Sequence, residues 1–271
     1  MTRSARRRTV SVVIPTQNRR PLIARALDSV RAQTRKADEI LVVDDGSTDD
    51  TARFVSEAYP EARLLRQENR GVSAARNAGI RASEGELVAF LDSDDEWLPR
   101  KLERQLQAME ASPDTLLCHT NEIWIRNGRR VNPMKKHEKS GGWIFEKALP
   151  LCVISPSSVV ASRRLFDVVG LFDEDLPACE DYDLWLRVCA YHPVLFVDEP
   201  LLVKHGGHED QLSRRHWGMD RFRIQALRKI LDRDDLPEDY RRAAEAMLAK
   251  KQEIFACGAK KREAPLSCSA S

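Results

Sequence analysis

The first hundred residues alternate short apolar runs with segments of helical periodicity, and this rhythm limits the folds open to the chain. The runs are rich in β-branched residues and are expected as strands at Thr9–Ile14, Glu39–Val43, Arg63–Arg66 and Leu87–Leu91. The helical segments follow Pro21, span Thr51–Ala58 and Val72–Ala82, and continue after Pro99. Strands alternating with helices predict βαβ units and a parallel, doubly wound α/β sheet. Ligands of such sheets bind beyond the carboxyl ends of the strands.

Polar clusters follow three of the expected strands. They are Thr16–Arg19, Asp44–Asp49 and Asp92–Asp95. Parallel strands bring their carboxyl ends to one edge of a sheet, so the three clusters are expected to converge. The sequence therefore predicts one ligand site at that edge.

Phe90–Asp95 combines the end of an apolar strand with three carboxylates. Burying such groups unpaired is costly, and a divalent cation with oxygen ligands relieves the cost. Mg²⁺ and Mn²⁺ commonly share those ligands with substrate phosphates. The alternative is a solvated turn before a helix N-terminus, where acids are also favoured. Other Asp-x-Asp pairs occur at Asp173, Asp181 and Asp232, but only this one directly follows an apolar strand.

Composition indicates a globular chain and gives no reason to expect nucleic acid as a partner. Its 271 residues suit one large domain or two small ones, with 42% hydrophobic and 32% charged residues and a formal net charge of +2. Six cysteines form no C-x-x-C pair, and no apolar run reaches the length of a membrane span. We expect free thiols and a cytoplasmic location. The basic N-terminal tail and the C-terminal helices are candidates for peripheral contact with the inner face of a membrane.

After Ser112-Pro113 the pattern becomes irregular. Further strands are expected at Leu116–Ile125, Ser155–Ala161, Val194–Val197 and Leu201–Lys204, with a polar hairpin or loop at Asn127–Gly142. From Trp217 the spacing predicts two helices, the second starting at Pro237. The chain lacks G-x-G-x-x-G after its first strand and lacks G-x-x-x-x-G-K-[ST], which argues against a dehydrogenase or a P-loop enzyme.

Five motifs, taken in order, resemble the inverting glycosyltransferases of family 2. They are Val12–Arg19, Val42–Asp49, Asn69–Asn77, Phe90–Asp95 and Glu180-Asp181. The resemblance covers about Val10 to Ser213 and implies a GT-A fold, with a Rossmann-like, mostly parallel central sheet flanked by helices. We divide this region, at the change of pattern after Ser112-Pro113, into a nucleotide-sugar-binding half (10–112) and an acceptor half (113–213), and expect a basic disordered tail (1–9) before it. A C-terminal helical hairpin (214–258) and a disordered tail (259–271) lie outside it.

The resemblance implies a nucleotide-diphosphate-sugar donor, most often UDP-linked. It also indicates which residues bind that donor and its metal ion. The residues expected to bind the donor are Pro15, Thr16, Asn18, Arg19, Asp44 or Asp45, Arg76, Asp92 and Ser93. Asp94, with Asp92 and His208, is expected to hold Mn²⁺ or Mg²⁺, and His205 is the alternative histidine. From the residues alone, Arg76 suits a salt bridge as well as it suits the diphosphate.

On the acceptor side, the resemblance makes Asp181 the general base and Glu180 its supporting acid. A helix N-cap is the alternative role for Asp181. The function implied is metal-dependent, inverting transfer of a sugar to an acceptor hydroxyl, typical of cell-envelope or polysaccharide synthesis. No motif in the sequence identifies the acceptor, whether it is a glycan, a lipid-linked molecule or a small molecule.

Two other functions compete with this one. The first is a sugar-phosphate nucleotidyltransferase, which usually has a Gly-rich loop after its first strand; Thr16–Arg19 has no glycine. The second is a non-catalytic nucleotide-sugar-binding protein, against which the complete set of acids argues.

Overall fold

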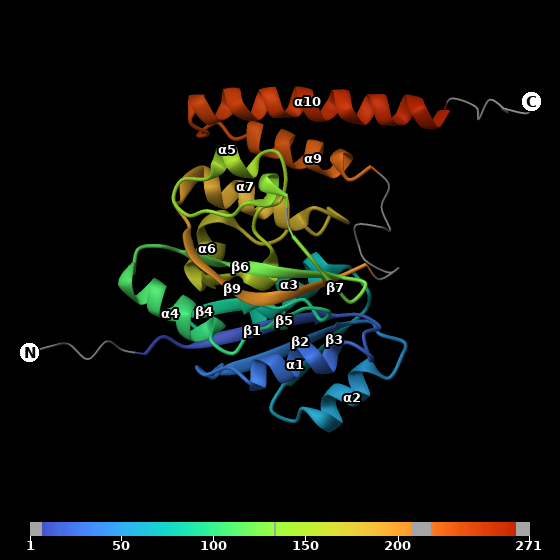
Figure 1. Ribbon diagram of the computed structural model, residues 1–271, viewed down its shortest axis with the longest axis vertical. Helices are drawn as coiled ribbons and strands as arrows, with labels where there is room; N and C mark the ends of the chain where they lie inside the picture. Colours follow the sequence, from blue (N-terminus) through green and yellow to red (C-terminus); the bar gives the residue numbers. More distant parts are fainter. Residues whose placement is uncertain (1–6, 133, 208–217, 264–271) are drawn as a thin grey trace, which may run out of the picture.

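The computed structural model describes residues 7–132, 134–207 and 218–263, with side chains described as far as 258. Its centre is a nine-stranded sheet in the order β3-β2-β1-β4-β8-β6-β9-β5, with β7 paired to β6 (Figure 1). The strands are β1 (Val10–Thr16), β2 (Glu39–Asp45), β3 (Arg63–Gln67), β4 (Leu87–Phe90), β5 (Glu96–Trp97), β6 (Leu117–Arg126), β7 (Arg129–Val131), β8 (Val160–Ser162) and β9 (Leu195–Gly206).

The first half of the sheet is parallel, as the alternating sequence pattern predicts. β1 lies between β2 and β4 and runs parallel to both, and β3 runs parallel to β2. In the register, Thr16 pairs with Asp44, and Val13 pairs with Phe90, the residue at which β4 ends. The polar residues that follow these strands therefore emerge at the same edge.

The second half of the sheet is mixed. β8 is antiparallel to β4 and β6, while β9 is parallel to β6 and antiparallel to β5. The sequence suggests two strands here, but the structure has the single strand β9. Pro200 lies within β9 and pairs with Asn121, where the register between β6 and β9 shifts. The expected strand at Ser155–Ala161 starts instead as a 3₁₀ turn, Pro156–Ser158, and becomes extended only in β8. The sheet is mostly parallel in its nucleotide-side half, as expected for a GT-A fold.

Helices cover both faces of the sheet because the side chains of each strand alternate between the faces. Val12 and Ile14 pack with α1 (Ile23–Arg31), α2 (Thr51–Ala58) and α4 (Lys101–Ala111). Val13 packs on the opposite face. That face is covered by α3 (Val72–Ala82), α5 (Phe145–Ala148), α6 (Arg163–Val169) and α7 (Glu180–Tyr191). The inner parallel strands β1, β2 and β4 are consequently mostly apolar and buried on both faces, as buried parallel strands usually are.

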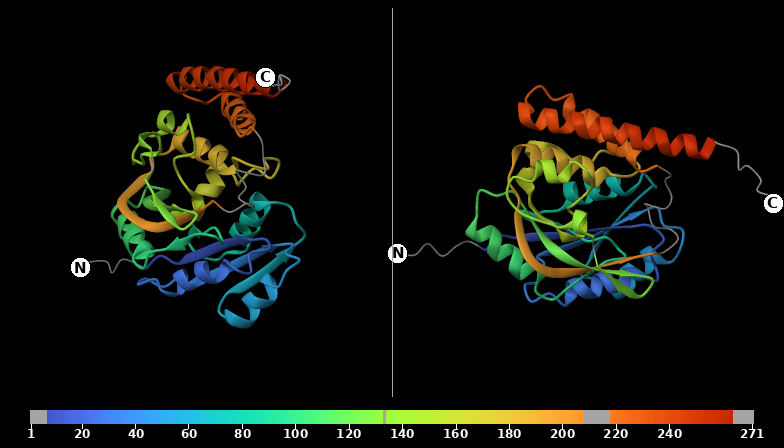
Figure 2. Two further views of the ribbon diagram at one scale, coloured as in Figure 1. Left: turned by 45° about the vertical axis from the view of Figure 1, so that its right-hand side comes forward. Right: turned by 45° about the horizontal axis from the view of Figure 1, so that its top comes forward.

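Two C-terminal helices form an antiparallel pair that packs over α7 and α5 (Figures 1 and 2). They are α9 (Asp220–Leu231) and α10 (Glu238–Glu263). Phe222, Leu227 and Ala244 join them to the core on that face of the sheet. α10 runs five residues past 258, where the sequence suggests disorder. None of the helices in the described part of the chain is long and apolar enough to cross a membrane.

Lys101 is an unusual core residue and gives a testable pH dependence. Its side chain on α4 is fully buried, and its ammonium has no hydrogen-bond partner in the part of the chain that the structure describes. The ammonium nitrogen lies 3.9 Å from the centre of the Trp97 ring. Burial lowers the pKa of this lysine from 10.5 to about 7. Between these pH values the unfolded chain holds one more proton than the folded chain, so raising the pH stabilises the fold.

We therefore expect the free energy of unfolding to rise from pH 7 to pH 9 by up to about 1.4 kcal/mol per pH unit from this group. Lys101→Met should be more stable than the wild type at pH 7, and its advantage should shrink at pH 9. Urea denaturation at both pH values measures this. An advantage that is the same at both values would contradict the assignment.

Candidate active site

A cavity of about 860 Å³ opens at the carboxyl-end edge of the parallel strands. Its walls include residues from all three strand-end clusters and from the start of α7. The convergence expected from the sheet order is therefore present in the structure. Of the residues named from the sequence, the lining contains Pro15, Thr16, Arg19, Asp45, Arg76, Asp92, Ser93, Asp94, Glu180 and Asp181.

The end of β1 contributes to the cavity and also joins two loops. Thr16 is buried, and its hydroxyl has no hydrogen-bond partner among the described residues. Asn18 does not line the cavity. Its amide oxygen accepts hydrogen bonds from the backbone N–H groups of Thr48 (2.8 Å) and Asp49 (3.3 Å). These bonds give Asn18 a structural role, holding the β2 loop beside β1, and its direct contact with the nucleotide stays a prediction.

The adjacent acids Asp44 and Asp45 have different environments, because neighbouring side chains of a strand point to opposite faces. Asp44 is fully buried and accepts a hydrogen bond from Arg66 Nε (3.1 Å); it is not part of the cavity lining. Asp45 does line the cavity, and its carboxylate accepts the backbone N–H groups of Arg70 (2.9 Å) and Gly71 (2.8 Å). The sequence leaves these two acids as alternatives, and the cavity lining favours Asp45.

Gly46 allows the loops after β2 and β3 to meet. Its φ is +73°, and a Cβ at this position would lie 2.8 Å from the backbone nitrogen of Asn69. A side chain here would be strained and would also push away the segment that Asp45 holds.

Arg76 connects the two sets of acids in the site. It lies on α3, is 3% exposed, and donates hydrogen bonds to Glu180 Oε1 (2.6 Å) and Asp92 Oδ1 (2.7 Å). Burial and the nearby Asp181 raise the pKa of Glu180, while Arg76 opposes that rise. The salt bridge that the sequence leaves open for Arg76 is present in the structure, and its role toward the diphosphate stays a prediction.

The turn after β4 brings three carboxylates to the cavity, and one of them is almost fully buried. Asp92, Asp94 and Asp95 all belong to the cavity lining, but Asp95 is only 2% exposed. Asp95 accepts hydrogen bonds from Ser157 Oγ (2.6 Å) and the backbone N–H of His205 (3.1 Å). Burial, followed by the charge of Asp94, raises its pKa well above the usual value. The sequence assigned no separate role to Asp95, which fixes this turn against β9.

The fit of a divalent cation rests on Asp92 and Asp94. Among the described residues, no three His, Cys, Asp or Glu side chains gather as a metal site. Two carboxylates beside a large cavity nevertheless suit Mg²⁺ or Mn²⁺, which take one or two protein carboxylates and complete their shell with phosphate and water. His208, expected as a further ligand, lies outside the described residues. His205 lines the cavity, where its Nε2 faces Glu96 Oε2 at 3.4 Å.

Asp181 lies in the first turn of α7 and faces the cavity. The N-cap position of this helix belongs to Cys179, so the alternative role of Asp181 as the N-cap is wrong. Cys179 has φ +61°, an uncommon conformation for a residue other than glycine. This bend directs the acidic first turn of α7 toward the cavity.

Several charged lining residues had no signal in sequence spacing. Glu122 Oε1 accepts a hydrogen bond from Trp124 Nε1 (2.7 Å), and Glu122 Oε2 lies 3.3 Å from Lys139 Nζ. Lys204 lies on β9 close to the acids, and Glu122 and Asp95 contribute most to raising its pKa above the usual value. These groups come from separate strands and loops, so only the folded sheet brings them together.

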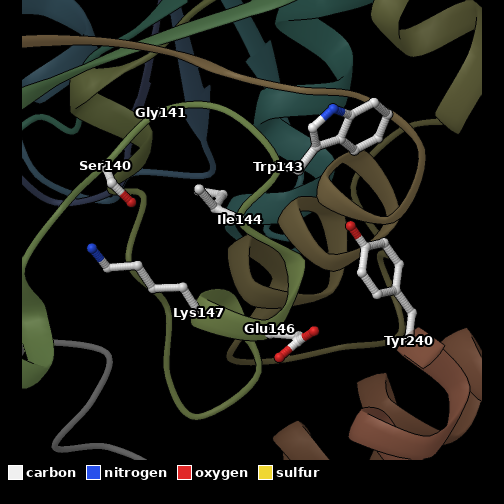
Figure 3. A pocket seen from close by; sticks show the side chains of 7 residues that line it. All are labelled: Ser140, Gly141, Trp143, Ile144, Glu146, Lys147 and Tyr240. Atoms are coloured by element: carbon white, nitrogen blue, oxygen red, sulfur yellow. The ribbon is translucent and has the colours of Figure 1, made fainter.

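A second hollow, of about 340 Å³, lies between residues 140–147 and the start of α10 (Figure 3). Trp143 and Tyr240 lie on one side of it, and Ser140 and Lys147 on the other (Figure 3). Its described lining includes only one carboxylate, that of Glu146. The larger cavity, which contains several acids from different elements, is therefore the candidate active site.

Solved structures share this fold. S. aureus TarS in complex with UDP-GlcNAc superposes with a TM-score of 0.75, over 95% of this chain and 76% of that chain, at 21% identity. A mannosyltransferase from Pyrobaculum calidifontis in complex with GDP-Man and Mn²⁺ gives a TM-score of 0.66 over 94% and 81% of the two chains, at 22% identity. At these identities the likeness shows the fold, which is GT-A.

Sequence relatives are also glycosyltransferases. An uncharacterised glycosyltransferase of Rickettsia felis is 35% identical over 195 residues, which are 71% of this chain and 32% of the relative. The chain thus spans about a third of that relative's length. An Escherichia coli UDP-Glc:alpha-D-GlcNAc-diphosphoundecaprenol beta-1,3-glucosyltransferase is 33% identical over 185 residues, which are 66% of this chain and 69% of the relative. The sequence profile of the Glycosyl transferase family 2 matches residues 11–163, and the chain belongs to that family.

Proposed function

We propose that this glycosyltransferase moves a sugar, with inversion, from a UDP-linked donor to an acceptor hydroxyl, using a divalent metal and Asp181 as general base. One observation carries the proposal. A single cavity contains the carboxylates that follow β4 and the acids that begin α7, and Arg76 joins the two sets through Asp92 and Glu180.

The donor half of the site is built from strand ends. Pro15, Thr16, Arg19, Asp45 and Ser93 would surround the nucleoside, with Asn18 and Asp44 holding the loops behind them. Asp92 and Asp94 would hold Mn²⁺ or Mg²⁺ against the diphosphate. When bound, such an ion stabilises negative charge on the departing nucleoside diphosphate as a Lewis acid.

The acceptor half of the site is built around the start of α7. In an inverting transfer the acceptor oxygen forms its bond to the anomeric carbon as the bond to the diphosphate breaks. Asp181 would take the proton of that hydroxyl, a role worth about 10²–10⁴-fold in rate. Glu180, held by Arg76, would position the helix turn that carries Asp181.

Donor and acceptor classes follow from the relatives by analogy. The S. aureus neighbour is described with UDP-GlcNAc, the E. coli relative with UDP-Glc, and the archaeal neighbour with GDP-Man and Mn²⁺. The E. coli relative acts on a lipid-linked acceptor. Two of these three examples carry a UDP sugar, which supports a UDP-linked donor. We propose a role in cell-envelope or polysaccharide synthesis, at the cytoplasmic face of a membrane.

A donor screen tests this function. Melting temperatures would be measured with UDP-Glc, UDP-GlcNAc and GDP-Man, with and without Mn²⁺. We expect one UDP sugar to stabilise the protein only with Mn²⁺, by about 2.7 kcal/mol at one hundred times its Kd. Asp94→Asn should abolish the effect of Mn²⁺, whereas Asp114→Asn, an exposed acid outside the cavity, should retain it.

The product then separates the remaining functions. Release of UDP in the presence of an acceptor supports sugar transfer. Formation of pyrophosphate from a nucleoside triphosphate and a sugar phosphate would support a nucleotidyltransferase instead. Tight donor binding without hydrolysis or transfer would support a binding protein.

A further inference from the structure

The C-terminal helix pair reaches the active-site cavity, although it lies outside the matched family region. Met219 and Arg223, at the start of α9, belong to the cavity lining. The sulfur of Cys179 lies 3.8 Å from the carbonyl oxygen of Met219, so the start of α9 contacts the residue that precedes Glu180 and Asp181. Figures 1 and 2 show α9 lying along α7, which brings this end of the helix to the acidic turn.

One N–H group of the Arg223 guanidinium makes no hydrogen bond with the described residues. Its Nη1 donates to Asp220 Oδ1 (2.8 Å), but its Nε is buried and has no partner among the described residues. Lys251, from α10, donates to the same oxygen of Asp220 (3.0 Å). Arg223 and Lys251 thus share one carboxylate, which leaves a surplus of one positive charge among these three residues.

This positive charge lies on the side of the cavity that contains Asp181, the proposed general base. Arg223 lines the same cavity as Asp181, and Cys179, which contacts the start of α9, comes two residues before Asp181 in the chain. Arg223 is therefore grouped with Asp181, whereas Asp94, the carboxylate assigned to the metal, lies in the turn after β4.

We propose that Arg223 binds a phosphate group of the acceptor, which makes the acceptor an anionic, phosphate-bearing sugar. The inference rests on the proposed function, because it assigns the acceptor side of that same site. A guanidinium offers parallel N–H donors that match phosphate oxygens. The described lining has more carboxylates than lysines and arginines, and Arg70, Arg76 and Lys139 are each paired with one of those carboxylates. A phosphate is therefore favoured where the helix pair supplies extra positive charge.

The test compares acceptors that differ only in charge. N-acetylglucosamine would be offered as its octyl glycoside, as its octyl phosphodiester, and as the octyl glycoside of the corresponding uronic acid. The full chain would be used with the UDP sugar and Mn²⁺ identified in the donor screen, in wild-type, Arg223→Gln and Arg223→Lys forms. Arg221→Gln is the matched control, because Arg221 lies on the same helix but is exposed.

For the wild type we expect kcat/KM to be about 10- to 100-fold higher for the phosphodiester than for the neutral glycoside. Arg223→Gln should bring the ratio of the two values close to one, and Arg223→Lys should restore part of it. Arg221→Gln should retain the wild-type ratio. A stronger preference for the uronic acid would overturn phosphate as the recognised group.

Calorimetry separates this inference from the function on which it rests. Octyl phosphate would be titrated into the wild type and Arg223→Gln, each saturated with UDP and Mn²⁺. Weaker binding by Arg223→Gln supports the inference, even if no donor is turned over and the proposed function fails. Equal binding by the two proteins overturns it. A loss of affinity for UDP itself in Arg223→Gln would assign Arg223 to the donor and also overturn it.

Discussion

Asp181→Asn is expected to lower the rate of sugar transfer by about 10²–10⁴-fold, the usual contribution of a general base. An amide cannot accept the proton of the acceptor hydroxyl at neutral pH. Its carbonyl oxygen can still accept the backbone N–H of Tyr182, as Asp181 Oδ1 does at 2.7 Å. The substitution therefore preserves the local helix turn and removes the base.

Initial rates of UDP release with a saturating acceptor measure the effect. A thermal shift with donor and Mn²⁺ shows whether donor binding survives, and we expect that it does. Asp167→Asn is the control, because Asp167 is an exposed acid on α6, outside the cavity. Transfer by Asp181→Asn at the wild-type rate would refute the base assignment.

Arg76→Met is expected to cost about 3–5 kcal/mol of unfolding free energy. The substitution keeps the apolar stem but leaves Glu180 and Asp92 without their common cation. Glu180 is 4% exposed, so its charge would be buried without a partner. Urea denaturation at pH 7 measures the loss.

A second variant separates the ion pair from simple packing. In Arg76→Met with Glu180→Gln, the buried charge is gone, and part of the lost stability should return. Arg81→Met is the control on the same helix. The Arg81 side chain is 61% exposed, and its Nη1 lies 3.6 Å from Glu174 Oε1. This substitution should lower the free energy of unfolding by about 0–1 kcal/mol. Equal losses for Arg76→Met and Arg81→Met would contradict the role of Arg76.

The predictions for Asp181 and Arg76 concern one connected group of side chains. Arg76 holds Glu180 at the start of α7 and Asp92 at the end of β4. The acids assigned to the donor and to the acceptor are thereby kept at a fixed spacing. Loss of Arg76 should therefore reduce transfer as well as stability.

Much of the fold was predictable because it depends on local periodicity. The helices at Thr51–Ala58 and Val72–Ala82 have the bounds expected from their apolar spacing. The edge at which the polar clusters meet follows from the parallel order of the strands. The two-residue strand β5 was not predictable, because Glu96–Trp97 becomes a strand only by pairing with β9.

The sequence could not predict the details of the site that depend on the direction of a side chain. Asp44 and Asp45 are chemically identical neighbours, and only the orientation of the strand end puts Asp45 in the cavity lining and the buried Asp44 in an ion pair with the exposed Arg66. The amide of Asn18 holds the neighbouring loop. These contacts join residues 22–30 positions apart in the chain.

Local patterns of polarity and residue type were enough to predict the alternation of strands and helices, the acids at the strand ends and the family motifs. The folded molecule was needed to show which acids Arg76 joins, that Lys204 enters the cavity, and that Arg223 of the C-terminal helices lines the same cavity as the acidic turn of α7. Those juxtapositions arise from packing between segments distant in the chain, which local periodicity does not encode.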